Sequence, residues 1–183
     1  MSRQRRTTHD RKQRCAAPKI DVFVLNYNGQ NHLKRCLPSL FKMTWPNFSV
    51  SVVDNGSTDG SQDFVRRKYP KVELIEIGAN LGFSRALNLA ISKSKAPFVC
   101  SLNNDIEVTP NWLNVLVKDF RDTKVAVSVP KMYDFLGRFN SAGGACDLYS
   151  WAYNRVTGEI DRGQHAESCY GPYGRLGICE LGV

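Results

Sequence analysis

The chain has 183 residues, 42% of them hydrophobic, which is enough for one compact domain with a real core and leaves little room for a second. The formal net charge of +8 is of the size seen in nucleic-acid-binding proteins, but it is unevenly distributed. Residues 1–19 alone carry +6, so the remaining residues carry only +2. The net charge therefore comes mainly from the N-terminal segment and not from the rest of the chain.

Residues 1–18 are predicted to form a basic disordered tail, because a segment with few apolar residues cannot offset the entropy lost on ordering. Two partners remain open for residues 1–19: anionic lipid headgroups, where each basic residue could add about 1 kcal/mol, and RNA. The absence of aromatic residues among the charges weakens the case for stacking on RNA bases, and no specific nucleic-acid partner is expected.

The six cysteines form no Cys-x-x-Cys pair, and no secretory leader precedes them. No apolar run approaches the roughly 20 residues of a membrane-spanning helix. A cytoplasmic protein with reduced thiols, at most peripheral at the inner face of the membrane, is therefore expected.

Short β-rich apolar runs alternate with stretches of helical spacing, which predicts βαβ units and a largely parallel sheet. The predicted strands are residues 20–25, 48–53, 72–77, 97–102 and 125–129.

The first helix is predicted from an apolar stripe made of Leu33, Cys36, Leu37, Leu40 and Phe41. Pro38 is expected to break or kink it. The second helix is expected to start with Asp59 as the capping residue and to bury Phe64, Val65 and Tyr69.

A third helix is predicted from Ser84, with Leu87, Ala90 and Ile91 facing inward. The fourth is predicted to begin with Thr109 as the cap and Pro110 at the first helical position. Its inward residues are expected to be Trp112, Leu113, Leu116, Val117 and Phe120. Beyond Pro130 the sequence predicts no definite elements.

Each of the first four predicted strands is followed by a polar cluster, at residues 26–29, 54–60, 78–82 and 103–105. Asn-Gly and Asp-Gly are common turn formers, so one such cluster alone is an ordinary loop. Ligands of open parallel sheets bind outside the carboxyl ends of the strands, where loops converge. Four successive clusters on that edge therefore indicate a ligand site.

In this order the four clusters resemble those of the family 2 glycosyltransferases, and most closely the rhamnosyltransferase-like branch with the GT-A fold. Residues 141–147 and the aromatic stretch through Trp151 and Arg155 also resemble that branch. The resemblance runs from about residue 19 to about residue 164. It implies an α/β fold, a Rossmann-like mostly parallel sheet with flanking helices, in a nucleotide-sugar-binding domain over residues 19–183.

The same resemblance implies transfer of a hexosyl or rhamnosyl group from a nucleotide-diphosphate sugar to a hydroxyl of a glycan or lipid-linked acceptor, with inversion, in cell-wall or polysaccharide biosynthesis. By that resemblance, Asn26 and Asn28 would line the nucleoside pocket, and Asp54 would accept a hydrogen bond from the base.

Asn55, and Asn80 with the Gly82 loop, would shape the ribose and sugar contacts. Arg85 is a candidate for diphosphate or sugar contact, and a plain surface arginine is the alternative.

The resemblance also implies a metal-binding site. Asp105 matches the last member of the family's metal motif, where a carboxylate ligates Mg²⁺ or Mn²⁺ bridging the two phosphates. The motif's first acidic position is Asn103 here, and its amide offers only a neutral oxygen, so weaker metal binding is expected. Asn104 lies between them and joins the expected donor-binding residues.

An inverting transfer needs a general base, which the family places in a later segment, and the chain ends at Val183 before a matching one. Asp147, Asp161, Glu167 and Glu180 lie late in the chain without the matching context, so the base is left unassigned. A non-catalytic nucleotide-sugar-binding module and an inactive truncated product remain the alternatives. The glycine and lysine motifs of dinucleotide oxidoreductases and phosphate-loop hydrolases are missing.

Overall fold

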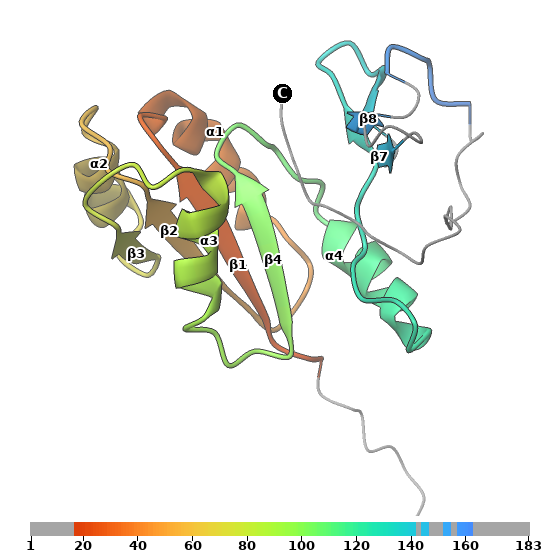
Figure 1. Ribbon diagram of the computed structural model, residues 1–183, viewed down its shortest axis with the longest axis horizontal. Helices are drawn as coiled ribbons and strands as arrows, with labels where there is room; N and C mark the ends of the chain where they lie inside the picture. The colour runs from red at the N-terminus through yellow and green to blue at the C-terminus, as the bar shows by residue number, and fades with distance from the viewer. Residues whose placement is uncertain (1–16, 142–143, 147–151, 155–156, 163–183) are drawn as a thin grey trace, which may run out of the picture.

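The computed structural model describes residues 17–141, 144–146, 152–154 and 157–162. The predicted tail at residues 1–18 lies outside this range except for its last two residues. Four parallel strands form one sheet in the order β3-β2-β1-β4 (Figure 1). They are β1 (Ile20–Asn26), β2 (Phe48–Asp54), β3 (Glu73–Glu76) and β4 (Phe98–Asn103). This arrangement confirms the α/β fold and the first four predicted strands.

The helices follow the strands in sequence, as the βαβ pattern requires. They are α1 (Gln30–Leu40), α2 (Ser61–Lys68), α3 (Phe83–Ile91) and α4 (Trp112–Leu116), and α4 continues into the 3₁₀-helix η1 (Val117–Arg121). After η1 come two short antiparallel pairs, β5 (Met132–Tyr133) with β6 (Phe139–Ser141) and β7 (Gly144–Cys146) with β8 (Ala152–Asn154).

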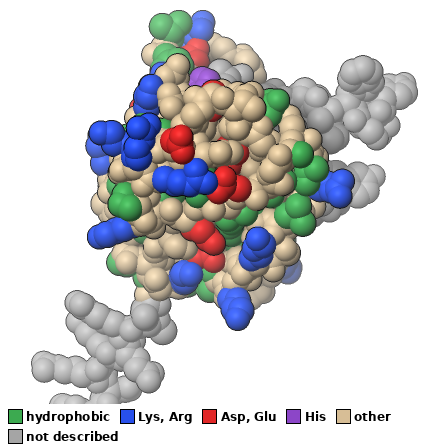
Figure 2. All heavy atoms as spheres, turned by 90° about the vertical axis from the view of Figure 1, so that its left-hand side faces the viewer, with side chains coloured by type: hydrophobic (Ala, Val, Ile, Leu, Met, Phe, Trp, Pro, Cys, Tyr) green, Lys and Arg blue, Asp and Glu red, His purple; other side chains and the backbone are tan. Residues whose placement is uncertain are grey.

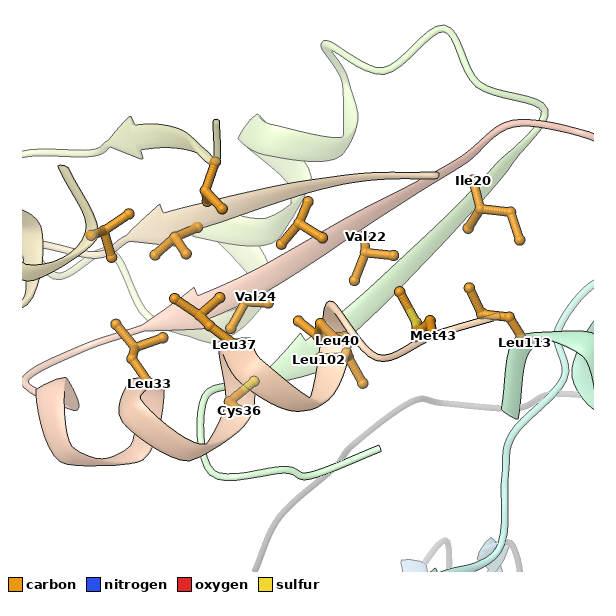
Figure 3. Packing of buried hydrophobic residues seen from close by; sticks show 14 of the residues in the cluster. Ile20, Val22, Val24, Leu33, Cys36, Leu37, Leu40, Met43, Leu102 and Leu113 are labelled. Carbon is orange, nitrogen blue, oxygen red and sulfur yellow. The ribbon is translucent and has the colours of Figure 1, made fainter. Parts of the chain in front are cut away.

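The central strand β1 is buried on both faces, so its residues alternate between two cores. Val22 and Val24 face α1 and α4, where they pack with Leu33 and Leu37 (Figure 3). Phe23 faces the opposite side and packs with α3. Burial of each such side chain contributes about 1.5–3 kcal/mol, which explains why a nearly continuous apolar run forms a central strand.

Pro38 was expected to break or kink α1. The helix continues two residues past Pro38, so the break does not occur, and the kink stays a prediction. Proline removes the hydrogen bond to the carbonyl of Lys34, and Lys34 lies on the exposed side of the helix, where water can satisfy that carbonyl. Phe41 was predicted to join the buried stripe. It lies beyond the end of the helix, 48% exposed, and stacks on Tyr69 with ring centroids 5.7 Å apart.

The predicted start of the fourth helix is also wrong. Asn111, not Thr109, is the N-cap, and no side chain caps this end. The Pro110 carbonyl accepts hydrogen bonds from the backbone N–H and the hydroxyl of Thr44, at 2.8 and 3.0 Å. Because that carbonyl is already engaged, the first helical hydrogen bond runs from the Val115 N–H to the Asn111 carbonyl.

The fifth predicted strand, residues 125–129, is not a strand. The Val125 N–H donates to the Asp122 carbonyl at 3.0 Å, which closes a turn, and no described strand pairs with this run. An apolar, β-branched run forms a strand only where a neighbouring strand offers its free edge.

Candidate functional site

The carboxyl ends of three neighbouring strands lie level with one another. Asn26 at the end of β1 is paired in register with Asp54 at the end of β2, and Leu25 is paired with Asn103 at the end of β4. The end of β3 lies level with them too, because Asp54 is also paired with Glu76. The four predicted polar clusters therefore emerge at one edge of the sheet, as the pattern predicted. We call this edge, with residues 26–29, 54–60, 78–82 and 103–107, the carboxyl edge.

Three side chains form a hydrogen-bonded chain across this edge. Asn104 Nδ2 donates to Asn26 Oδ1 at 2.7 Å, and Asn26 Nδ2 donates to Asp54 Oδ1 at 3.0 Å. Asn26 and Asp54 are fully buried. Because β1 lies between β2 and β4 in the sheet, this chain ties the loop after β4 to the loop after β2.

The second oxygen of Asp54 is also occupied. Asp54 Oδ2 accepts hydrogen bonds from Gln62 Nε2 at 2.7 Å and from the backbone N–H of Ser57 at 3.0 Å. Burial alone would raise the pKa of Asp54, but the hydrogen bonds from Gln62, Ser57 and Asn26 outweigh it and hold that pKa below its usual range. Asp54 is thus a buried, charged carboxylate held by protein donors, without an exposed oxygen for a base.

Ser57 and Gln62 were not singled out from the sequence, although both hold Asp54. Ser57 follows Asp54 by three residues, the spacing at which an aspartate accepts a bond from a nearby backbone N–H in a turn, so this part of the network had a readable signal. Gln62 lies in the first turn of α2 and reaches back to Asp54, and no local pattern indicates that contact.

Glycine at position 29 leaves room for the amide pair, which would have to shift for a larger residue. A Cβ there would lie 1.9 Å from Asn104 Nδ2 and 2.8 Å from Asn26 Oδ1, both far inside van der Waals distance. Its φ of −121° is ordinary, so the side chains, not the backbone, exclude a larger residue.

A second network joins the loops after β2 and β3. Asn55 Nδ2 donates to Asn80 Oδ1 at 3.0 Å and to the Gly82 carbonyl at 3.3 Å. In return, Asn55 Oδ1 accepts the backbone N–H of Leu81 at 2.9 Å. Gly56 lies against the same loop, since a Cβ there would lie 2.8 Å from the Cα of Ala79.

Asn28 forms the exposed part of the edge. It has a left-handed backbone, with φ of 50°, and Asn28 Oδ1 accepts the backbone N–H of Thr58 at 2.8 Å. The Asn28 N–H donates to Ser57 Oγ at 2.9 Å. Asp59 accepts the N–H groups of Gln30 and Ser61, at 2.8 and 3.0 Å. The N-cap of α2 is Gly60, with no side-chain cap, so the prediction of Asp59 as the capping residue is wrong by one position.

Asp105 is the exception at this edge. Its Oδ1 atom is buried and accepts no hydrogen bond, the only such side-chain atom among the residues that the structure describes. A buried carboxylate oxygen without a donor is costly unless a cation or a ligand supplies the missing charge. Oxygen ligands of this kind suit Mg²⁺ or Mn²⁺, so the residue fits a divalent cation. No described group of three His, Cys, Asp or Glu side chains could hold a metal by itself.

A core cysteine lies behind the Asp105 loop. Cys36 Sγ is 4.0 Å from the Asn103 carbonyl. Burial, with the nearby carboxylates of Asp105 and Glu107, raises the pKa of Cys36 to about 12, so the thiol stays protonated and donates to that carbonyl.

The remaining predicted residues are less enclosed. Arg85 is exposed in the first turn of α3, with no hydrogen bond or ion pair to the described part of the chain. Asp161 accepts hydrogen bonds from Tyr133 Oη at 2.5 Å and Lys131 Nζ at 3.1 Å. The other late acidic residues, Asp147, Glu167 and Glu180, lie outside the described residues. Within the described residues, no helix is both long and apolar enough to cross a membrane.

The sequence of the chain is similar to sequences of known proteins. The sequence model of the family "Glycosyl transferase family 2" matches residues 21–171. The chain is 40% identical over 74 residues to N-acetylglucosaminyl-diphospho-decaprenol L-rhamnosyltransferase of Mycobacterium tuberculosis, a match covering 40% of this chain and 24% of that protein. It is 28% identical over 120 residues to glycosyltransferase GlyA of Streptococcus pneumoniae, covering 64% of this chain and 17% of GlyA. The chain thus spans a quarter or less of these relatives.

Two solved structures have a similar fold. The mannosyltransferase PcManGT from Pyrobaculum calidifontis, in complex with GDP-Man and Mn²⁺, matches with a TM-score of 0.55 and 28% identity, over 59% of this chain and 34% of that one. TarS from S. aureus, in complex with UDP-GlcNAc, matches with a TM-score of 0.52 and 23% identity, over 72% of this chain and 41% of that one. At this identity the likeness shows a shared fold and no more.

Proposed function

Because this chain belongs to the family 2 glycosyltransferases and has their GT-A fold, we propose that it binds a nucleotide-diphosphate sugar at the carboxyl edge and transfers the sugar to an acceptor hydroxyl with inversion. The observation that carries the proposal is the buried Asp105 Oδ1 without a donor, at the edge where the loops of a parallel sheet converge. A divalent cation bound with the donor would supply the positive charge that this oxygen lacks, and the donor's phosphates would supply further oxygen ligands.

The differing burial of the polar residues at the carboxyl edge supports different roles for them. Asn28 is exposed and is proposed to contact the nucleoside. Asn26 and Asp54 are fully buried, and a direct bond from the base to Asp54 would require a protein donor to give way. We therefore assign Asn26 and Asp54 the positioning of the two loops that flank the nucleoside.

The residues nearest the sugar are proposed from the second network. Asn55 is buried and fixes the loop that carries Asn80 and Gly82, so it would set the position of that loop against the ribose and the sugar. Arg85, exposed at the start of α3, is proposed to neutralise diphosphate charge.

Asp105 would hold Mg²⁺ or Mn²⁺, with Asn103 as a neutral amide ligand and Asn104 fixing the loop through Asn26. When bound, the cation would stabilise negative charge on the departing diphosphate. One carboxylate and one amide are a weak set for a hard cation, so the phosphates of the donor would complete the site.

We propose a glycan or lipid-linked acceptor, in cell-wall or polysaccharide biosynthesis, at the inner face of the membrane. The decaprenol-linked acceptor named for the mycobacterial relative supports this choice. The alternative function is a module that binds the donor without turnover.

The proposal is tested by titrating the chain with a panel of nucleotide-diphosphate sugars by calorimetry, with and without Mn²⁺, followed by transfer assays with radiolabelled donor. We expect metal-dependent binding of at least one donor. Binding followed by transfer supports the enzyme, and binding without transfer supports the module. If no donor binds in either condition, the proposal fails.

A further inference from the structure

The opposite edge of the sheet, where the strands begin, is rich in exposed lysine and arginine. We call this the amino edge, and its cations are Lys19, Lys42, Lys68, Lys71, Lys93, Lys95, Lys118 and Arg121. The acidic residues at this level are Asp21, Glu73, Asp119 and Asp122, of which Asp21 is buried and paired with Lys19 at 2.9 Å. Figure 2 shows Lys and Arg side chains along the lower margin of one side of the molecule.

Helix dipoles explain only part of this pattern. A lysine at the carboxyl end of a helix is stabilised by the dipole, which accounts for residues such as Lys42, Lys68 and Lys93. Lys19, Lys71 and Lys95 instead precede strands β1, β3 and β4. Strands have no comparable dipole, and Lys19 is paired with Asp21, so Lys71 and Lys95 need another explanation.

The basic N-terminal segment joins the fold at this same edge. Trp45 Nε1 donates to the Pro18 carbonyl at 3.1 Å, and Asn47 Nδ2 donates to the Ala17 carbonyl at 2.8 Å. Ala17 and Pro18 are therefore fixed at the amino edge. In the sequence they follow residues 1–16, which hold six further Arg and Lys residues against Asp10.

The face also has an aromatic component. A hollow of about 480 Å³ lies beside Pro18 and is lined by the rings of Trp45, Phe98 and Phe120. Lys118 and Arg121 line the same hollow. Rings beside cations are the combination found where a protein meets the headgroup region of a bilayer, since each has an apolar body and a polar or charged neighbour.

We propose that the amino edge binds the surface of an anionic phospholipid bilayer. Each lysine or arginine that reaches the surface strengthens binding about fivefold, so several acting together give stable yet salt-sensitive attachment. The carboxyl edge lies at the far end of seven-residue strands, about 20 Å away. Bound membrane and bound donor therefore do not compete, and this inference does not depend on the proposed transfer reaction.

The test is sedimentation of the full chain with vesicles of phosphatidylcholine and phosphatidylglycerol, compared with vesicles of phosphatidylcholine alone. The test variant is Lys71→Gln/Lys95→Gln/Lys118→Gln, and the matched control, Lys34→Gln/Arg35→Gln/Arg66→Gln, removes the same charge nearer the carboxyl edge. Thermal unfolding checks that both variants fold. We expect the test variant to bind anionic vesicles about ten- to a hundredfold more weakly, and the control to bind within about threefold of the natural chain.

Three outcomes would overturn the proposal. Equal binding to neutral vesicles would exclude the anionic surface, and equal losses in the two variants would exclude the amino edge. Because RNA is the other polyanion of similar charge density, binding to single-stranded RNA is measured in parallel. Loss of RNA binding in the test variant with unchanged vesicle binding would assign the face to RNA instead.

Discussion

Asn104 donates a 2.7 Å hydrogen bond to the side chain of Asn26, which joins the end of β4 to the end of β1. Through Asn26 the link continues to Asp54 at the end of β2. The loop proposed to hold the cation and the loop proposed to flank the nucleoside are thus one hydrogen-bonded unit. Changes in this unit are expected to alter donor binding and folding together.

Gly29→Ala should disrupt the amide pair, because the new methyl group would lie 1.9 Å from Asn104 Nδ2. We expect a loss of about 1–3 kcal/mol in the free energy of unfolding, measured with urea. The double variant Gly29→Ala/Asn104→Ala removes the nearest clashing group and should recover part of that loss. If the double variant is less stable by the sum of the two single changes, the clash does not exist.

Asp54→Asn should destabilise the chain at neutral pH by about 2–4 kcal/mol, because charge-assisted hydrogen bonds are lost and an amide N–H₂ faces other donors. The folded-state pKa of Asp54 is lowered, so its stabilisation is complete above the unfolded pKa of about 3.9 and is lost as the pH falls through the folded value. The variant's stability should therefore decline less steeply below about pH 4 than that of the natural chain.

The control for this change is Asp63→Asn, since Asp63 is exposed and its carboxylate bonds only to Arg66 among the described residues. Its stability should match that of the natural chain within about 0.5 kcal/mol at neutral pH. Asp21 and Asp59 also have lowered pKa values, so the acid decline is reduced in Asp54→Asn and not abolished. An unchanged acid decline in Asp54→Asn would contradict the assignment.

Asp105→Asn should weaken Mn²⁺-dependent donor binding by about ten- to a hundredfold, because the one carboxylate at the proposed cation site becomes neutral. Calorimetry with nucleoside diphosphate, with and without Mn²⁺, measures the effect. The matched change Glu107→Gln removes a charge two residues away whose side chain is half exposed and paired with Arg35 at 3.6 Å. It should leave the metal dependence intact, and an equal loss in the two variants would argue against Asp105 as the ligand.

Gly56→Ala and Gly78→Ala form a matched pair, because both glycines have nearly the same left-handed backbone, with φ of 84° and 83°. A Cβ at Gly78 meets nothing within 4 Å, so that change should cost only the conformational term, about 1–2 kcal/mol. A Cβ at Gly56 would lie 2.8 Å from the Ala79 backbone, and a further 1–3 kcal/mol or so is expected. Equal unfolding free energies would show that the two loops can separate freely.

The sequence was sufficient to predict the sheet and the edge that carries the site, because both depend on local patterns. Apolar runs predicted β1 to β4, and each observed strand end falls within about two residues of its prediction. Asn26 and Asp54 are the last residues of their strands. Each takes part in the parallel pairing, and each turns its side chain to the loops.

The misses have a common cause, which is that they depend on contacts between distant residues. The fourth helix begins late because Thr44 occupies the Pro110 carbonyl, and Thr44 is 66 residues away. Residues 125–129 lack a strand partner, which no local pattern reveals. The same holds within the site: the enclosure of Asp54 by Gln62, and the bond between Asn104 and Asn26 across 78 residues, could not be read from the sequence.

The thiol of Cys36 contacts the apolar core on one side and the Asn103 carbonyl on the other. The Cys36 side chain therefore lies between the core and the loop that is proposed to hold the cation. Repacking the core at this position would be transmitted to Asp105 without any change to a polar residue. If the proposed cation site is correct, its affinity for a cation depends on the packing of the scaffold, and an engineer could adjust the first through the second.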